Sequence, residues 1–349
     1  MIGDWRNPLG SFDAACRAAQ VTFKREPAPG RWVRGDANDG NRRRPYDAST
    51  LLFPDKPGGI VWNFHAGLRV IWFADADGRK LTARELQDLR SAAEKAIRRY
   101  EAHRRCVYDT TAQFAARILD MAHPANAHPY LLRKRVSSVP GLWEIDASTL
   151  RAEYLRNYSN GIYEREKPPS LWDKKAKRPF EGRVLIVPLY DGKDFSRVRS
   201  LEFISETGAK LALADGAAGG SFWMPEELRK HDAPPEEIGI AEGLATALSL
   251  SQVQCIPVVS ARSCGNLKAA ALSLLAQFPY ARLYVFGDVG KPGDENPQGE
   301  IKAREAARLS GAEALFPVFT PDLVERFKAL TGSEAPTDWN DFYLSKGDL

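Results

Sequence analysis

The sequence predicts a multidomain protein of mixed class, in which a parallel α/β domain follows an α+β lobe of mostly antiparallel strands. At 349 residues the chain is longer than one typical domain. Residues 236–349 alternate strand-like and helical runs, as a parallel sheet with helices on both faces requires. Residues 136–235 carry strand-like runs separated by turns and no helix of ordinary length after about residue 165, which favours antiparallel pairing.

The chain is expected to divide into four regions. Residues 1–78 form a small β-rich module, because short strand-like runs stand there among Gly, Pro, Arg and aromatic residues. Residues 79–135 form a helical connector, since the stretch 81–120 contains no Pro or Gly and has apolar residues near helical spacing. A basic lobe at 136–235 and the α/β domain at 236–349 complete the chain.

Charge is distributed unevenly between the two ends of the sequence. Residues 1–235 carry 39 Lys and Arg against 30 Asp and Glu, whereas residues 236–349 carry 10 against 15. The basic surplus of residues 1–235 suits contact with a polyanion, and the acidic surplus of residues 236–349 suits the binding of divalent cations. An ordinary scatter of solvated charges is the alternative interpretation.

Several classes of protein are disfavoured. No apolar run reaches the length of a bilayer span and the N-terminus lacks the pattern of a signal peptide, so we expect a cytoplasmic protein with no membrane partner. The four cysteines form no CxxC pair, which argues against a zinc ribbon or a disulfide framework. The absence of GxxxxGK[ST] argues against an ATP-driven motor.

Acidic residues follow the strands of the predicted parallel sheet. The strand-like run EIGIA leads directly into Glu242 and Gly243, and a helical run starts at once with LATALS. The run ARLYVFG delivers Asp288 to the same edge, because parallel strands place their carboxyl ends together. A third acidic group comes from TDWND, through Asp338 or Asp341. Carboxylates converging from different strands are what Mg²⁺ or Mn²⁺ needs beside a phosphate.

These residues, in this order and spacing, resemble the Toprim domain of bacterial primases, topoisomerases and certain nucleases. The pattern EGxxTAxS at 242–249 is similar to the branch found in DNA primases of phages and plasmids. The resemblance implies a catalytic role for Glu242 and Asp288, and metal binding by these two together with Asp338 and Asp341. The sequence departs from the family at the usual DxD pair, because it reads Asp288-Val289-Gly290. Asp294 or Glu295 in the following loop is the candidate substitute for the missing ligand.

The resemblance extends into the basic lobe. HPYLLRKRV and the segment from Gly182 to Lys210 are similar to the lobe that precedes Toprim in these primases, where basic residues face the template and the incoming nucleotides. Lys210 is the leading candidate, because a family lysine follows a glycine turn at this place. The other candidates for contact with nucleic acid or nucleotides are Arg133, Lys134, Arg183 and Arg199.

The N-terminal module adds aromatic residues among arginines, including Trp62 and Phe64. Such a set suits stacking on unpaired bases, although a hydrophobic core is the more common use of aromatics in a small β-module.

Taken together, the resemblance implies a DNA primase of a mobile element that makes short primers on a single-stranded DNA template from nucleoside triphosphates by metal-dependent nucleotidyl transfer. A replicative helicase is a further expected partner. Two alternatives stay open: a Toprim nuclease that uses the same metal site, and a noncatalytic single-stranded nucleic-acid-binding factor with a degenerate Toprim domain.

Overall fold

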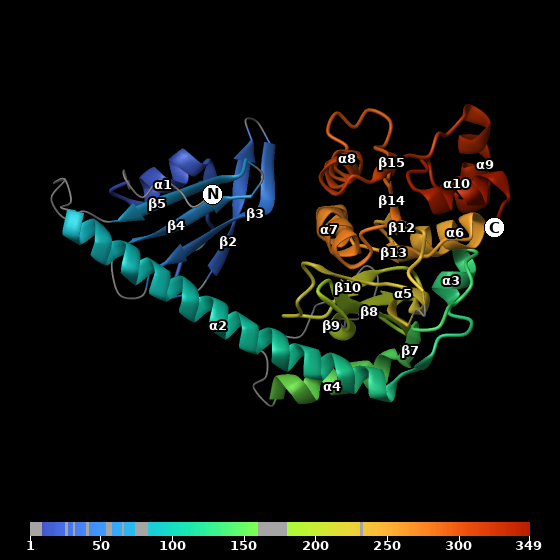
Figure 1. Cartoon of the computed structure of the whole chain (residues 1–349), viewed down its shortest axis with the longest axis horizontal. Coiled ribbons are helices and arrows are strands. Elements are labelled where there is room, and N and C mark those ends of the chain that lie inside the picture. The colour runs from blue at the N-terminus through green and yellow to red at the C-terminus, as the bar shows by residue number, and fades with distance from the viewer. Residues whose placement is uncertain are drawn as a thin grey trace. The chain divides into compact units, whose positions relative to one another are not determined.

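The chain separates into two compact units, Met1–Cys106 and Val107–Leu349, each of which is described by itself (Figure 1). No helix in the described ranges combines the length and the apolar character needed to cross a membrane. All four cysteines are free thiols. The computed structural model describes residues 9–24, 27–30, 32–39, 42–53, 58–64, 66–73, 83–159, 180–230 and 233–349.

The N-terminal unit is built on an antiparallel sheet with the strand order β1-β2-β3-β4-β5. Helix α1 packs against one face, where Ala15, Val61 and Trp72 are buried. Ile60 and Phe73 point to the other face, because neighbouring residues of a strand alternate between the two faces. The elements are α1 (Phe12–Ala19), β1 (Val21–Thr22), β2 (Trp32–Asp39), β3 (Arg42–Leu52), β4 (Gly58–Asn63) and β5 (Leu68–Phe73).

A 39-residue helix, α2 (Ala83–Met121), begins in the N-terminal unit and ends in the C-terminal unit. Its last turns pack Phe114 and Ile118 against Tyr154 and Phe203. The lobe that follows has a six-stranded antiparallel sheet with the order β10-β9-β8-β7-β6, and β11 pairs with β8. The elements of this lobe are β6 (His123–Pro124), α3 (Pro129–Arg133), β7 (Trp143–Asp146), α4 (Ala147–Ser159), β8 (Arg183–Asp191), β9 (Asp194–Ser205), β10 (Lys210–Ala212), β11 (Ser221–Phe222) and α5 (Glu226–Arg229).

The last part of the chain is a four-stranded parallel sheet with the order β13-β12-β14-β15. Helices cover both faces: α6 and α10 share one core with Ala241 and Phe286, whereas α7 and α8 share another with Ile240 and Val285. The elements are β12 (Glu237–Ala241), α6 (Leu244–Gln254), β13 (Val258–Ser260), a 3₁₀ turn (Cys264–Asn266), α7 (Leu267–Gln277), β14 (Arg282–Phe286), α8 (Gln298–Ser310), β15 (Glu313–Leu315), α9 (Pro321–Thr331) and α10 (Trp339–Lys346).

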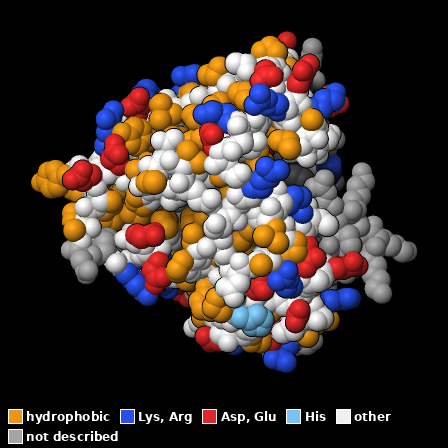
Figure 2. Space-filling model, turned by 90° about the vertical axis from the view of Figure 1, so that its right-hand side faces the viewer, with side chains coloured by type: hydrophobic (Ala, Val, Ile, Leu, Met, Phe, Trp, Pro, Cys, Tyr) orange, Lys and Arg blue, Asp and Glu red, His pale blue; other side chains and the backbone are white. Residues whose placement is uncertain are grey.

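This architecture confirms the predicted fold class: antiparallel sheets come first and a parallel sheet with helices on both faces follows. The finer four-part division of the chain stays a prediction. On the face shown in Figure 2, Lys and Arg are interspersed with Asp and Glu.

Candidate active site

The candidate site lies at the carboxyl edge of the parallel sheet. Glu242 follows β12 directly, and Gly243 is the N-cap of α6 in an extended conformation. Asp288 stands two residues beyond the end of β14. Because β12 and β14 pair in parallel, with Ala241 opposite Phe286, both acids leave the sheet at the same edge.

Asp288 is the most perturbed acid of this edge. Its pKa is raised from the ordinary 3.8 to about 8, first by burial and then by the nearby Asp338, Glu242 and Asp341, while Lys210 opposes them. Its Oδ1 atom is buried and finds no hydrogen-bond partner among the residues that the structure describes. This carboxylate is therefore placed where ionisation is costly unless a cation accompanies it.

The pKa of Glu242 is raised as well, but opposing influences act on it. Burial raises its pKa and so does the nearby Asp338, whereas a hydrogen bond from the Cys264 backbone N–H and the charge of Lys210 lower it. The net pKa lies above the ordinary value, which makes Glu242 a better proton acceptor than an ordinary glutamate.

Asp338 and Asp341 are brought to the edge by the start of α10. Asp338 caps that helix and accepts a hydrogen bond from the Asp341 backbone N–H at 2.9 Å. The Asp341 carboxylate accepts one from the Thr337 backbone N–H at 3.1 Å and one from Lys134 Nζ at 3.4 Å. Burial and Asp338 raise the pKa of Asp341, and Lys134 opposes them. Asp341 is thus held by the lobe, while Asp338 interacts with Asp288 and Glu242.

Lys210 extends from the antiparallel lobe to the candidate site. A Cβ placed on Gly243 would lie 3.8 Å from the Lys210 ammonium nitrogen, so this side chain reaches the turn after β12. The surrounding protein lowers the pKa of Lys210, but Tyr130, Glu202 and Asp338 outweigh it and raise the pKa above its ordinary value. Lys210 is therefore a firmly charged cation beside the carboxylates.

Sequence reasoning missed Glu202. This residue of β9 is only 5% exposed, and its pKa is raised by burial and lowered by Lys210 and Arg262. It lies in the run VRSLEFIS between Leu201 and Phe203, and because such alternation turns a charge away from the face of its apolar neighbours, the local pattern gave no signal that Glu202 is buried.

The acids fit a hard divalent cation. Within the described ranges, no three His, Cys, Asp or Glu side chains stand close enough together to make a finished metal cluster. The orphaned Asp288 Oδ1, however, lies within the electrostatic reach of three other carboxylates. An all-oxygen donor set of this kind suits magnesium, which keeps several of its waters and completes its shell with substrate phosphates. Glu242, Asp288 and Asp338 are the carboxylates that we propose for it, and they would have to move closer together than they stand here.

At Gly290, where the family usually has its second aspartate, the structure leaves no room for a side chain. A Cβ added at Gly290 would stand 2.7 Å from Pro297 Cβ, which is too close without a shift of the loop. Asp294 is exposed and accepts a hydrogen bond from the Asn296 backbone N–H at 3.0 Å within its own loop. Glu295 is exposed as well.

The remaining basic candidates separate into two groups. Arg133 and Arg183 gather near Glu206, with Arg133 Nη1 2.6 Å from the Glu206 carbonyl oxygen and the Arg183 backbone N–H 2.9 Å from the Glu206 carboxylate. Arg199 lies elsewhere: it is 9% exposed and binds Asp109 of α2 at 2.9 Å. Its guanidinium is therefore occupied in the packing of β9 against α2.

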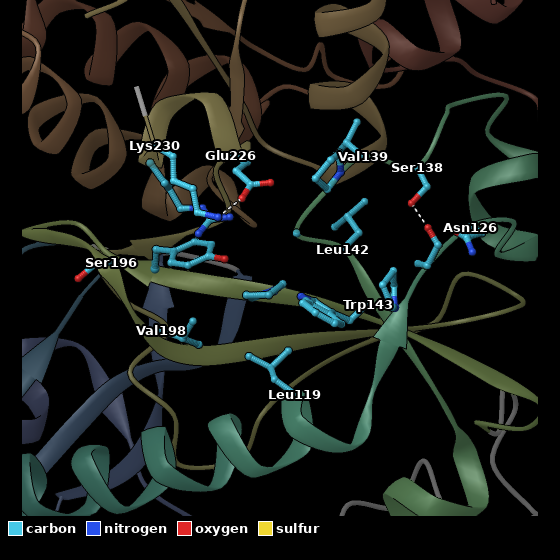
Figure 3. Close-up of a pocket in the computed structure, with 17 residues that line it drawn as sticks. Leu119, Asn126, Ser138, Val139, Leu142, Trp143, Ser196, Val198, Glu226 and Lys230 are labelled. Carbon is cyan, nitrogen blue, oxygen red and sulfur yellow. Dashed lines mark hydrogen bonds and ion pairs between the residues drawn. The ribbon is translucent and has the colours of Figure 1, made fainter. Parts of the chain in front are cut away.

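A separate pocket of about 690 Å³ lies between the end of α2, the segment before β7, the lobe sheet and α5 (Figure 3). It is mainly apolar, with Leu142 and Trp143 in its wall, and Arg229 stacks on Tyr190 at 4.3 Å. None of the predicted site residues lines it.

In the N-terminal unit, aromatic and arginine side chains alternate around β4 and β5. The rings of Trp62 and Phe64 are 4.7 Å apart, Arg34 lies over Phe64 at 4.9 Å, and Arg69 lies over Trp62 at 5.2 Å. Phe64 is exposed, whereas Trp72 belongs to the core. The predicted aromatic set is thus divided between surface and core.

Comparisons with known proteins concern the domain that carries the candidate site. Residues 237–348 match the family model of the Toprim domain, and this part of the chain is a Toprim domain. A DNA primase TraC of Escherichia coli is 34% identical over 147 residues, which is 40% of this chain and 13% of that protein. A second DNA primase TraC of Escherichia coli is 25% identical over 270 residues, or 76% of this chain and 16% of that protein. The chain therefore matches only a small part of these relatives.

Two solved primase structures resemble the chain distantly. The DnaG primase catalytic domain bound to single-stranded DNA is 16% identical, with 70% of this chain and 83% of that chain covered and a TM-score of 0.39. The zinc-binding and RNA polymerase domains of the Aquifex aeolicus primase are 17% identical, with 91% and 78% covered and a TM-score of 0.40.

Proposed function

We propose that this chain is a DNA primase of the mobile-element type, which joins nucleotides into short primers on single-stranded DNA. One observation carries the proposal: the carboxyl edge of a Toprim sheet gathers Glu242, Asp288 and Asp338, and Lys210 of the preceding lobe reaches the turn at Gly243. The regional identity to the TraC primases supports the same function.

In this proposal, the 3′-oxygen of one nucleotide forms a bond to the α-phosphorus of the next, the bond to the bridging oxygen breaks, and pyrophosphate leaves. Magnesium, when bound, would neutralise the charge that develops on the transferred phosphoryl group. Glu242 receives the proton of the attacking hydroxyl, for which its raised pKa is suited. Lys210 holds the nucleotide phosphates, because its ammonium group stays charged at neutral pH.

Single-stranded DNA and nucleoside triphosphates are the proposed partners, with a replicative helicase as a further one. A protein that copies DNA in the cell of its host would act in the cytoplasm, which is the compartment we propose.

A second candidate function follows from Gly290. The Toprim site lacks one usual aspartate, and the nearby Pro297 fills the space that its side chain would need. This favours, as the alternative, a noncatalytic factor that binds single-stranded nucleic acid.

Primer synthesis separates these candidates. Labelled nucleoside triphosphates and single-stranded DNA are incubated with the protein in Mg²⁺, in Mn²⁺ and in EDTA. We expect metal-dependent products from the wild type and none from Glu242→Gln, whose amide keeps the shape but cannot take up a proton. Degradation of the DNA would support a nuclease. Binding without extension or cleavage would support the noncatalytic factor.

A further inference from the structure

A third strand of the parallel sheet brings a basic residue to the acidic edge. Arg262 stands two residues beyond β13, which pairs in parallel with β12 so that Ser260 lies opposite Ala241. The Ala261 backbone N–H donates to the Ala241 carbonyl oxygen at 2.8 Å. The backbone leading to Arg262 therefore runs beside the backbone leading to Glu242.

The backbone of Arg262 is left-handed. Its φ is +71°, a conformation that glycine adopts freely and that other L-residues adopt at a cost. Gln20 and Cys255 have a similar φ but are helix C-caps, where this conformation is common. Arg262 follows a strand instead, so the fold keeps a strained arginine where a glycine would fit better. Strain of this kind collects at functional sites.

The guanidinium of Arg262 is incompletely satisfied. Its Nε atom is buried and has no hydrogen-bond partner in the described part of the chain. Its charge nevertheless reaches Glu202, which also interacts with Lys210. Arg262 of the parallel-sheet domain and Lys210 of the antiparallel lobe therefore both act on the carboxylate of Glu202.

We propose that Arg262 binds the triphosphate of the incoming nucleotide at the carboxyl edge of the Toprim sheet. A guanidinium offers several N–H donors in a fixed plane and binds phosphate oxygens in pairs, which gives a buried Nε–H the acceptor that it lacks. The inference rests on the proposed function in that the site takes nucleotides. The triphosphate is favoured over the template backbone because the chain that carries Arg262 leaves the sheet at the same edge as Glu242, and a metal held at that edge would draw nucleotide phosphates there.

The test compares Arg262→Gly with Arg308→Ala, an exposed arginine of α8 that serves as the matched control. Glycine removes the side chain but accepts the left-handed backbone, so thermal unfolding of Arg262→Gly should occur at or above the wild-type temperature. If Arg262→Gly unfolds below the wild-type temperature, Arg262→Lys replaces it in the binding measurements, because lysine retains the charge and lacks the paired donors.

Two affinities are measured by fluorescence anisotropy in Mg²⁺, one for a labelled nonhydrolysable nucleoside triphosphate and one for a labelled single-stranded oligonucleotide. We expect Arg262→Gly to bind the nucleotide at least about tenfold more weakly, the effect of losing one charge-assisted hydrogen bond, and to bind the oligonucleotide as the wild type does. The control variant should match the wild type in both.

Unchanged nucleotide affinity would overturn the inference, and so would a loss confined to the oligonucleotide or a wild type that binds no nucleotide. If the variant loses nucleotide binding and the wild type makes no primers, the inference stands and the primase proposal fails. If the wild type makes primers and the variant binds nucleotides normally, the primase proposal stands and the inference fails.

Discussion

Replacement of Asp288 by Asn should make the metal-free protein more stable at neutral pH. The carboxyl of Asp288 has an ordinary pKa of 3.8 and a pKa of about 8 in the folded protein, because of its burial and three acidic neighbours. At pH 7 the unfolded chain therefore carries an ionised Asp288, whereas the folded protein must hold it protonated. Each pH unit between the ordinary pKa and pH 7 costs about 1.4 kcal/mol, which amounts to a cost on the order of 4 kcal/mol.

Asparagine removes this cost, but its buried amide also lacks a hydrogen-bond partner, which lowers the free energy of unfolding by about 1–3 kcal/mol. The net gain in the free energy of unfolding should be about 1–3 kcal/mol at pH 7. The sign depends on pH. Because the folded pKa is raised, the folded wild type is at no disadvantage below the ordinary pKa and loses stability as the pH rises toward 8. Asp288→Asn should therefore be less stable than the wild type near pH 4, equal it about one to two pH units higher, and gain on it toward neutral pH.

The assay is urea unfolding in EDTA at several pH values between about 4 and 8, followed by a repeat in Mg²⁺. Metal should stabilise the wild type far more than Asp288→Asn, because the variant lacks one of the carboxylates whose negative charge the cation needs. Asp322→Asn is the matched control, since its side chain is 70% exposed, and it should change stability by less than about 0.5 kcal/mol. A variant less stable than the wild type at pH 7 in EDTA, or a gain independent of pH, would refute the reasoning.

Three further predictions concern the rest of the molecule. Arg199→Ala should lower the free energy of unfolding by about 1–3 kcal/mol, because it removes the buried partner of Asp109 on α2. Arg197 contacts the same aspartate at the surface, so Arg197→Ala should cost less than about 1 kcal/mol. Equal losses in urea unfolding would contradict this prediction. Gly290→Asp should lower the melting temperature and fail to increase primer synthesis, because its Cβ collides with the neighbouring loop; a gain in activity at unchanged stability would show that the loop adapts. The double variant Trp62→Ala and Phe64→Ala should weaken binding of single-stranded DNA about tenfold if the aromatic pair stacks on bases, and an unchanged affinity in anisotropy would assign the pair to structure alone.

The sequence by itself determined the fold class and the edge at which the acids meet. Alternation of strand-like and helical runs after residue 236 requires a parallel sheet, and such a sheet puts the ends of its strands together. Glu242 and Asp288 could therefore be assigned to one edge from the local pattern alone, since Glu242 follows β12 directly and Asp288 lies two residues beyond β14.

The tertiary structure decided which charges the site includes. Lys210 and Arg199 stand in the same antiparallel lobe, but only the packing of that lobe brings Lys210 to Gly243 and turns Arg199 toward α2. Glu202 and Arg262 became visible only through their burial and their mutual electrostatic influence. Local sequence specifies which residues a strand presents and on which face, whereas the partner that each charge meets depends on contacts between segments far apart in the chain.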